Sequence, residues 1–146
     1  MPAQIYQYTK ITEPGPNGRS LVARLPEGAI ELCTLDDVTY VSIPEGQAIP
    51  EQHQEITLTP VIVDYGLRER IKASSRACQL INEAMQQRIR AQHSVEDEQY
   101  FARIGVGAAL GAYTFQPGEQ EALLGFGAFV EEVRQWGRER REELGL

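Results

Sequence analysis

The sequence has few of the residues on which catalysis and cross-linking usually depend. Among 146 residues it holds 2 Cys and 2 His. It contains no GxSxG elbow, Walker loop, HExxH pair or EF-hand spacing. Cys33 and Cys78 are far apart in the sequence and form no CxxC pair, so we expect two reduced thiols. These absences predict a protein that is not an enzyme.

Signals for a bound cofactor or metal are equally sparse. Cys33, His53, Cys78 and His93 match no zinc-finger or knuckle spacing. The segment 104–113 reads IGVGAALGAY, which is GxGxxxG after a helical pattern, whereas a dinucleotide loop is GxGxxG after a strand. Its small residues favour either close helix packing or a flexible, partly irregular break. We therefore predict no metal, no cofactor and no small-molecule substrate.

Long apolar runs and an excess of basic residues are also missing. No stretch approaches the ~20 apolar residues of a membrane-spanning helix, and no basic-then-apolar start marks a secretory signal. The 14 basic residues are outnumbered by 21 acidic ones, a net charge of −7. Because phosphate binding depends on clustered Lys and Arg, we expect neither a membrane nor a nucleic acid as partner.

The negative charge is unevenly distributed. Residues 1–60 hold 8 acidic and 3 basic groups, whereas residues 61–146 hold 13 and 11. Within 64–92 the basic residues prevail: Arg68, Arg70, Lys72, Arg76, Arg88 and Arg90. We interpret this segment as a solvated helix face near an acidic first half.

The pattern of the chain changes near residue 64. Six of the eight prolines precede residue 51, and the segments between them alternate like short strands. From Asp64 on, the apolar spacing is helical. The sequence therefore predicts an α+β protein with a β-rich region over 1–63 and a helical region over 64–146. The first region is expected to be a small antiparallel sheet of three or four strands.

The clearest local feature of the sheet region is a hairpin over 29–43. Ala29–Leu35 and Val38–Ile43 are strand-like, and Asp36-Asp37 suits a two-residue turn. If Leu35 pairs with Val38, one apolar face results. That face consists of Ile30, Leu32, Val41 and Ile43.

Further strands are expected in the same region. Ile5–Ile11 and Ser20–Leu25 are predicted strands on either side of a turn-rich loop, and 46–57 reads as an extended loop. Leu58–Val63 is an edge strand or a connector because of Pro60. Either Ile5–Ile11 or Leu58–Val63 would offer a sheet edge to a partner strand.

The helical region is predicted to form a bundle of about three helices. One apolar stripe follows Asp64, and a second helix begins at Ser94, where Asp97 completes a capping box. A turn at 114–118 precedes the last helix, whose charged end at 138–146 we expect to be a solvated last turn. The first stripe consists of Leu67, Ile71, Ser74, Cys78, Ile81, Met85 and Ile89.

Apolar helix residues are the candidates for partner binding. The first stripe either packs within the bundle or forms the seam of an oligomer. The aromatic residues of the last helix are either part of the core or exposed to a partner. The candidate partner-binding residues are Leu67, Ile71, Cys78, Ile81, Met85, Phe129 and Trp136.

Parts of the helical region resemble a known class of phage proteins. The segments are LINEAMQQRIRAQHSVEDEQYFAR (80–103) and FVEEVRQWGRERREELGL (129–146), with VTYVSIPEG (38–46) and IPEQ (49–52) before them. They are similar to small tail-associated or tail-fibre assembly proteins of tailed bacteriophages. The resemblance implies no catalysis and no cofactor. It implies a tail or tail-fibre protein as partner, often with self-association, in the bacterial host cytoplasm or in the virion tail.

Two other functions stay open at this point. An acidic phage-encoded inhibitor of a host protein would use the net charge of −7 as a mimic of phosphate. A small enzyme would need a pocket that brings His53 or His93 beside a cysteine or a carboxylate. Neither alternative has a sequence motif of its own.

Overall fold

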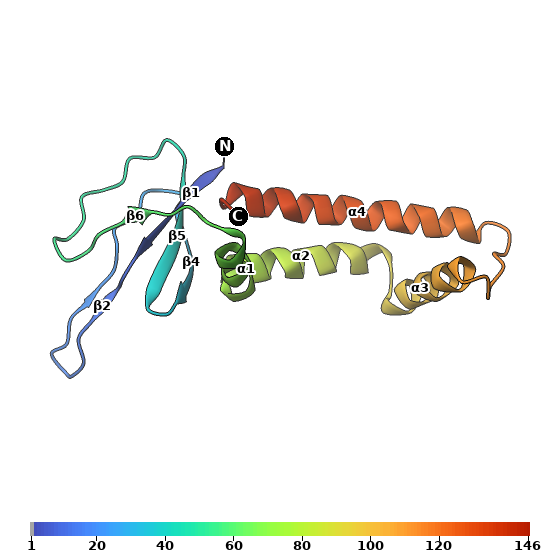
Figure 1. Ribbon diagram of the computed structural model, residues 1–146, viewed down its shortest axis with the longest axis horizontal. Coiled ribbons are helices and arrows are strands. Elements are labelled where there is room, and N and C mark those ends of the chain that lie inside the picture. Colours follow the sequence, from blue (N-terminus) through green and yellow to red (C-terminus); the bar gives the residue numbers. More distant parts are fainter. Residues whose placement is uncertain (1) are drawn as a thin grey trace. The chain divides into compact units, whose positions relative to one another are not determined.

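The computed structural model describes residues 2–146, and in these the strands come first and the helices follow (Figure 1). This confirms the α+β fold with an antiparallel N-terminal sheet. The strands are β1 (Ala3–Tyr8), β2 (Ile11–Thr12), β3 (Ser20–Leu21), β4 (Ile30–Leu35), β5 (Val38–Pro44) and β6 (Thr59–Pro60). The helices are α1 (Tyr65–Ser74), α2 (Arg76–Gln92), α3 (Val95–Ala109) and α4 (Glu119–Glu143).

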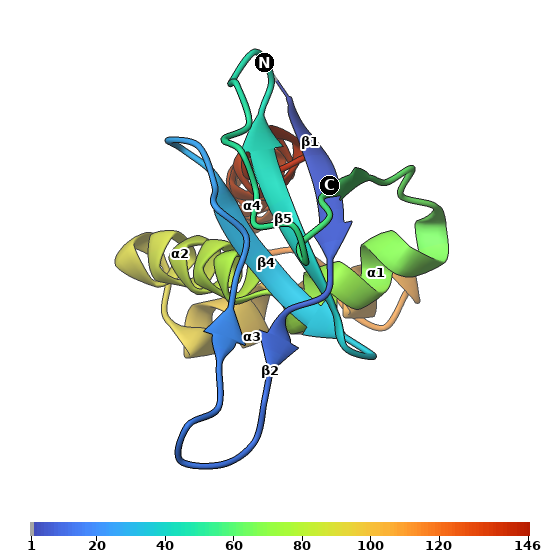
Figure 2. The ribbon, with the colours of Figure 1, turned by 90° about the vertical axis from the view of Figure 1, so that its left-hand side faces the viewer.

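The main sheet has four antiparallel strands in the order β4-β5-β1-β6, of which β4, β5 and β1 are seen side by side in Figure 2. β4 and β5 form the predicted hairpin, with Leu35 opposite Val38. Asp36 and Asp37 both have positive φ, at 50° and 66°. Two consecutive residues of positive φ make the type I′ turn, whose twist matches that of the two strands. The hairpin and its turn are confirmed.

The register prediction is wrong beyond Cys33. Cys33 pairs with Tyr40, but the next pair is Glu31 with Val41, so Leu32 is the extra residue of a β-bulge. The bulge turns Leu32 away from Val41 and toward the opposite side of the sheet. Ile30 then pairs with Ser42 and stays 41% exposed.

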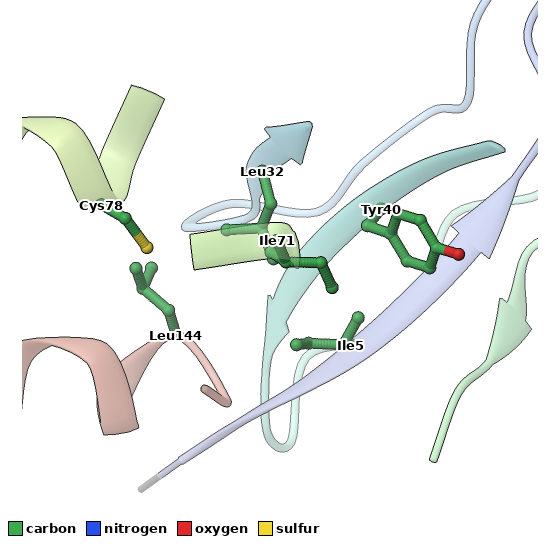
Figure 3. Close-up of a cluster of buried hydrophobic side chains, with 6 residues drawn as sticks. All are labelled: Ile5, Leu32, Tyr40, Ile71, Cys78 and Leu144. Atoms are coloured by element: carbon green, nitrogen blue, oxygen red, sulfur yellow. The ribbon is translucent and has the colours of Figure 1, made fainter. Parts of the chain in front are cut away.

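Both faces of the sheet are covered, whereas the sequence predicted one apolar face. Every residue from Thr39 to Ile43 in the central strand β5 is buried. On one face, helix residues and the C-terminal end pack on the sheet, as Figure 3 shows for Ile5, Leu32, Tyr40, Ile71, Cys78 and Leu144. On the other, loop residues pack around Tyr8, Ala23, Val41, Ile43 and Ile56. A strand buried on both sides loses the alternation of apolar and polar residues that reveals a half-buried strand.

The remaining strands are shorter than the sequence predicts. β2 and β3 pair over only two residues each, as a separate ribbon. The segment 46–57 holds no strand, as expected. β6 is an edge strand of two residues, Thr59 and Pro60. Proline has no N–H to donate, which explains why the strand is both short and placed at the edge.

The helical region has four helices because the first apolar stripe breaks at Ser75. Ser75 has extended backbone, with ψ 127°, and its N–H donates to the Ile71 carbonyl at 2.8 Å. Its buried hydroxyl accepts from the Cys78 N–H at 3.4 Å, so it caps the start of α2. The two helices replace the single helix that the stripe predicted.

The next two helices follow their sequence signals closely. The Ser94 hydroxyl accepts from the Asp97 N–H at 3.0 Å, and the Asp97 carboxylate accepts from the Ser94 N–H at 3.2 Å, which confirms the capping box of α3. The glycine-rich segment is helical up to Ala109. Gly111, with φ +73°, ends it. The turn before α4 is also confirmed.

The C-terminal end of the chain is docked on the sheet, so the expectation of a solvated last turn is wrong. Gly145, with φ +87°, donates to the Glu142 carbonyl, and Leu146 donates to the Arg141 carbonyl. These are the two bonds of a Schellman motif. The motif directs Leu144, 8% exposed, into the cluster of Figure 3.

Contacts divide the described chain into two compact units. The sheet unit comprises the residues up to Ile81 together with Glu139–Leu146, and the helical unit comprises Asn82–Arg138. The division falls inside α2 and inside α4, whereas the sequence pattern changes near residue 64. α1 and the first residues of α2 belong to the sheet unit because they cover one face of the sheet.

Candidate partner-binding surface

An open, mostly apolar groove lies between α3 and α4 in the helical unit. Its volume is about 420 Å³. The lining residues are Glu98, Phe101 and Ala102 from α3, and Leu123, Phe126, Gly127, Val130, Glu131 and Arg134 from α4. Apolar side chains alternate with a few charged groups at the rim, which is the composition of a protein-binding groove.

Aromatic side chains form the floor of this groove. The rings of Phe101 and Phe126 stack with centroids 4.8 Å apart. The His93 ring stands edge-on to Phe126, with centroids 4.9 Å apart, and contacts Phe129 at 5.6 Å. Such ring contacts fix the floor in one arrangement. Side chains that are already ordered lose less conformational entropy when a partner binds.

The rim charges are mostly paired within the helical unit. Glu98 forms an ion pair with Arg90 at 2.5 Å, and Glu131 forms one with Arg138. Arg134 lines the groove, and no ion pair joins it to another described residue. The groove therefore offers one guanidinium to a carboxylate on whatever occupies it.

The apolar surface continues from the groove along α3. Val95, Ala102, Val106 and Ala109 are spaced by 7, 4 and 3 residues, which places them on one side of the helix, and all four are exposed. Val95 is 47% and Val106 59% exposed. We define the apolar face as these four residues together with Phe101, Leu123, Phe126 and Val130.

The apolar face stays uncovered because the helical unit has only a small core. Within residues 82–138 the buried apolar side chains are Ile89, Ile104 and Val133. Three buried side chains make a small core, and each large apolar side chain that stays in water forgoes about 1.5–3 kcal/mol of burial free energy. Coverage by another protein would recover part of that free energy.

The structure distributes the sequence-predicted partner residues over both units. In the sheet unit, Ile71 and Cys78 are buried in the cluster of Figure 3, and Leu67 and Ile81 pack against it. Their packing is a feature of the fold, and a role in partner binding stays a prediction.

Three predicted residues lie in the helical unit and outside the groove lining. Met85 is half-buried on α2. Phe129 contacts His93, and the Trp136 ring lies under the Arg88 guanidinium, 3.9 Å from the ring centroid. Sequence reasoning missed Phe101 and the exposed side of α3. The spacing of Val95, Ala102, Val106 and Ala109 was the signal that could have found them.

The sheet edges are less open to a partner strand than the sequence predicts. β1 lies between β5 and β6, so Ile5–Ile11 is not an edge strand over its paired length. The β6 edge has two residues, one of which is Pro60. The β4 edge carries the bulge at Leu32. Bulges, prolines and short length are devices that prevent edge-to-edge pairing.

The cysteines are wholly or partly buried, and the histidines contact a loop N–H and aromatic rings. Burial raises the pKa of the Cys33 thiol and of the Cys78 thiol, which lowers the thiolate fraction of each at neutral pH. His53 accepts a hydrogen bond from the Glu55 N–H in a loop. The His93 ring packs edge-on against Phe126, which lines the groove. Within residues 2–146, no three His, Cys, Asp or Glu side chains gather where they would hold a metal ion.

Comparison with protein-family models, curated proteins and solved structures gives no match to this chain. In the described part of the chain, no helix combines the length and apolar character that crossing a membrane requires.

Proposed function

We propose that this chain is a non-enzymatic phage or prophage tail-associated protein that acts by protein–protein binding, as an assembly chaperone or a minor tail component. The proposal rests on two supports. One is the resemblance of residues 80–103 and 129–146 to such proteins. The other is the apolar face, which lies on α3 and α4, the helices to which most of those residues belong.

The apolar face is the observation that carries the proposal. It combines an aromatic floor, exposed valines on α3 and Arg134, which no ion pair joins to another described residue. This arrangement suits a helix or a loop of another protein, with apolar residues in the groove and a carboxylate near Arg134. The tail protein that binds this chain is expected to present that chemistry.

A pull-down from the native phage-infected or prophage-bearing background tests the proposal. The tagged full chain is expected to retain a tail or tail-fibre protein, identified by mass spectrometry, and to keep it as the ionic strength rises. Retention of no tail component would contradict the proposal. Steep loss of a retained host protein between low and moderate salt would instead favour the acidic inhibitor, since salt screens exposed charges.

A further inference from the structure

The loop between β2 and β3 carries an asparagine followed by a glycine. Residues 13–18 read EPGPNG, and every residue from Thr12 to Ser20 is exposed. Figure 2 shows this loop extending away from the main sheet. Among residues 2–146, no hydrogen bond joins the Asn17 side-chain amide to another residue. The amide therefore lies in water and is held by no neighbour in the described chain.

We propose that Asn17 is a site of spontaneous deamidation. The backbone nitrogen of Gly18 attacks the side-chain Cγ of Asn17, and the Cγ–Nδ2 bond breaks. Nδ2 leaves as ammonia with the proton of the Gly18 amide, and a succinimide ring remains. Water then opens the ring at either carbonyl, so that position 17 becomes aspartate or isoaspartate. Water is the co-reactant, nothing is oxidised or reduced, and the site does not depend on the proposed function.

Glycine at position 18 favours the attack, and the fold keeps a glycine there. Gly18 has no Cβ to hinder the approach of its nitrogen to Asn17, and its backbone is the most adaptable of any residue. A Cβ at position 18 would collide with the Glu13 carbonyl oxygen and would lie 3.1 Å from the Gly15 carbonyl oxygen. The loop thus requires the residue that makes the preceding asparagine labile.

Few hydrogen bonds hold the tip of the loop in one conformation. The Gly18 N–H donates to the Gly15 carbonyl at 3.1 Å, and the Glu13 N–H donates to the Arg19 carbonyl at 2.8 Å. Beyond them, β2 and β3 pair over only two residues each. Exposed loop tips with so few bonds open at a low cost in free energy. Opening of the Gly15–Gly18 bond frees the nitrogen that attacks.

Asn82 provides a control within the same chain. It is exposed like Asn17, but it lies inside α2 and is followed by Glu83. In a helix the N–H of the following residue is bonded to a carbonyl one turn earlier, so that nitrogen is held away from the side-chain carbon. Cyclisation there needs local unfolding of the helix. The two asparagines of the sequence therefore differ in backbone conformation and in the residue that follows, and share their exposure.

Deamidation changes the charge and the backbone of the tip. Arg19 pairs with Glu13 at 2.6 Å and with Glu55 at 3.2 Å. An aspartate or isoaspartate at position 17 adds a further negative charge near this network. Isoaspartate also leads the backbone through the side chain, which lengthens it by a methylene group. The isoaspartate form is therefore expected to lose the bond between Gly15 and Gly18.

Peptide mapping of the full chain by mass spectrometry, before and after incubation in neutral buffer, tests the proposal. Trypsin releases Asn17 in the peptide 11–19 and Asn82 in the peptide 77–88. Asn17 is expected to gain the mass difference between OH and NH2, in two chromatographically separate products, at least about tenfold faster than Asn82. The conversion is expected to be faster in mildly alkaline than in mildly acidic buffer, because the Gly18 nitrogen attacks after it loses its proton.

Two further samples separate the chemistry from the conformation of the loop. Asn17→Gln keeps an amide at position 17 but needs a larger ring, which closes far more slowly, so no conversion is expected over the same period. A chain unfolded in guanidinium chloride shows how fast Asn17 converts without the loop. Conversion in the unfolded chain but not in the folded chain, equal rates at Asn17 and Asn82, or aspartate without isoaspartate would each overturn the proposal.

Discussion

Gly145 shows how one residue attaches the C-terminal end to the sheet. Its φ of +87° is a conformation that L side chains rarely adopt, and a Cβ there would lie 2.7 Å from the Ala3 carbonyl oxygen. The Schellman motif that ends α4 therefore needs glycine for two reasons. The residue directs Leu144 into the core of the sheet unit.

Gly145→Ala is expected to lower the free energy of unfolding by about 2–5 kcal/mol, because left-handed backbone strain adds to a clash with β1. Chemical denaturation followed by circular dichroism measures the change. Gly46→Ala is the matched control. Gly46 also has positive φ, +84°, but nothing lies within 4 Å of its Cβ position. It should cost only about 1–2 kcal/mol. Equal losses in the two variants would contradict the described docking of the C-terminal end.

At the scale of elements, the break between α1 and α2 depends on Ser75, whose neighbour Ser74 has different surroundings. Ser75 is fully buried and caps α2, whereas Ser74 is exposed at the end of α1. Ser75→Ala removes the cap and is expected to lower the free energy of unfolding by about 1–2 kcal/mol. Ser74→Ala should change it by less than about 0.5 kcal/mol. Thermal or urea unfolding compares the two, and a larger effect at Ser74 would refute this account of the break.

The start of α4 is held by Glu119. Its carboxylate accepts hydrogen bonds from the Tyr100 hydroxyl, from the Tyr113 hydroxyl at 2.6 Å and from the Gln116 N–H at 2.6 Å. Three donors from α3 and from the connecting turn thus converge on one side chain. This arrangement ties α3 and the connecting turn to the start of α4.

Glu119→Ala is expected to lower the free energy of unfolding by about 1–3 kcal/mol, because the hydroxyls lose a charged acceptor. Glu121→Ala is the matched control, since Glu121 lies in the same first turn and is exposed. Its loss should not exceed about 1 kcal/mol, the usual contribution of a carboxylate at a helix N-terminus. Hydrogen exchange of the turn, measured for both variants, checks the result. Faster exchange in Glu121→Ala than in Glu119→Ala would be inconsistent with the described contacts.

Local signals in the sequence predicted the elements well. Asp36-Asp37 identified the hairpin turn, and Ser94 with Asp97 identified the start of α3, because both features depend on neighbouring residues. The bulge at Leu32 was missed because register counting assumes one residue per pair. The docking of Leu144 was missed because a charged helix end contains no local sign of a distant strand.

At the scale of the whole molecule, the two units bury different numbers of apolar side chains. Of 14 buried apolar side chains in the described chain, 11 belong to the sheet unit and three to the helical unit. The sheet unit thus has a core on both faces of its sheet. The helical unit presents the apolar face instead. The sequence predicted that the helices are the place to look for a partner, but the residues named for that role were not those of the apolar face.

Site-specific photo-cross-linking in the native background tests most directly whether the apolar face contacts a protein. A photoreactive amino acid at Ala102, on the groove rim, is compared with one at Ala91, which is exposed on α2 outside the groove lining. Protein adducts are expected from position 102 and are expected to be weak or missing from position 91. Equal yields from the two positions, or no protein adduct from position 102, would contradict that expectation.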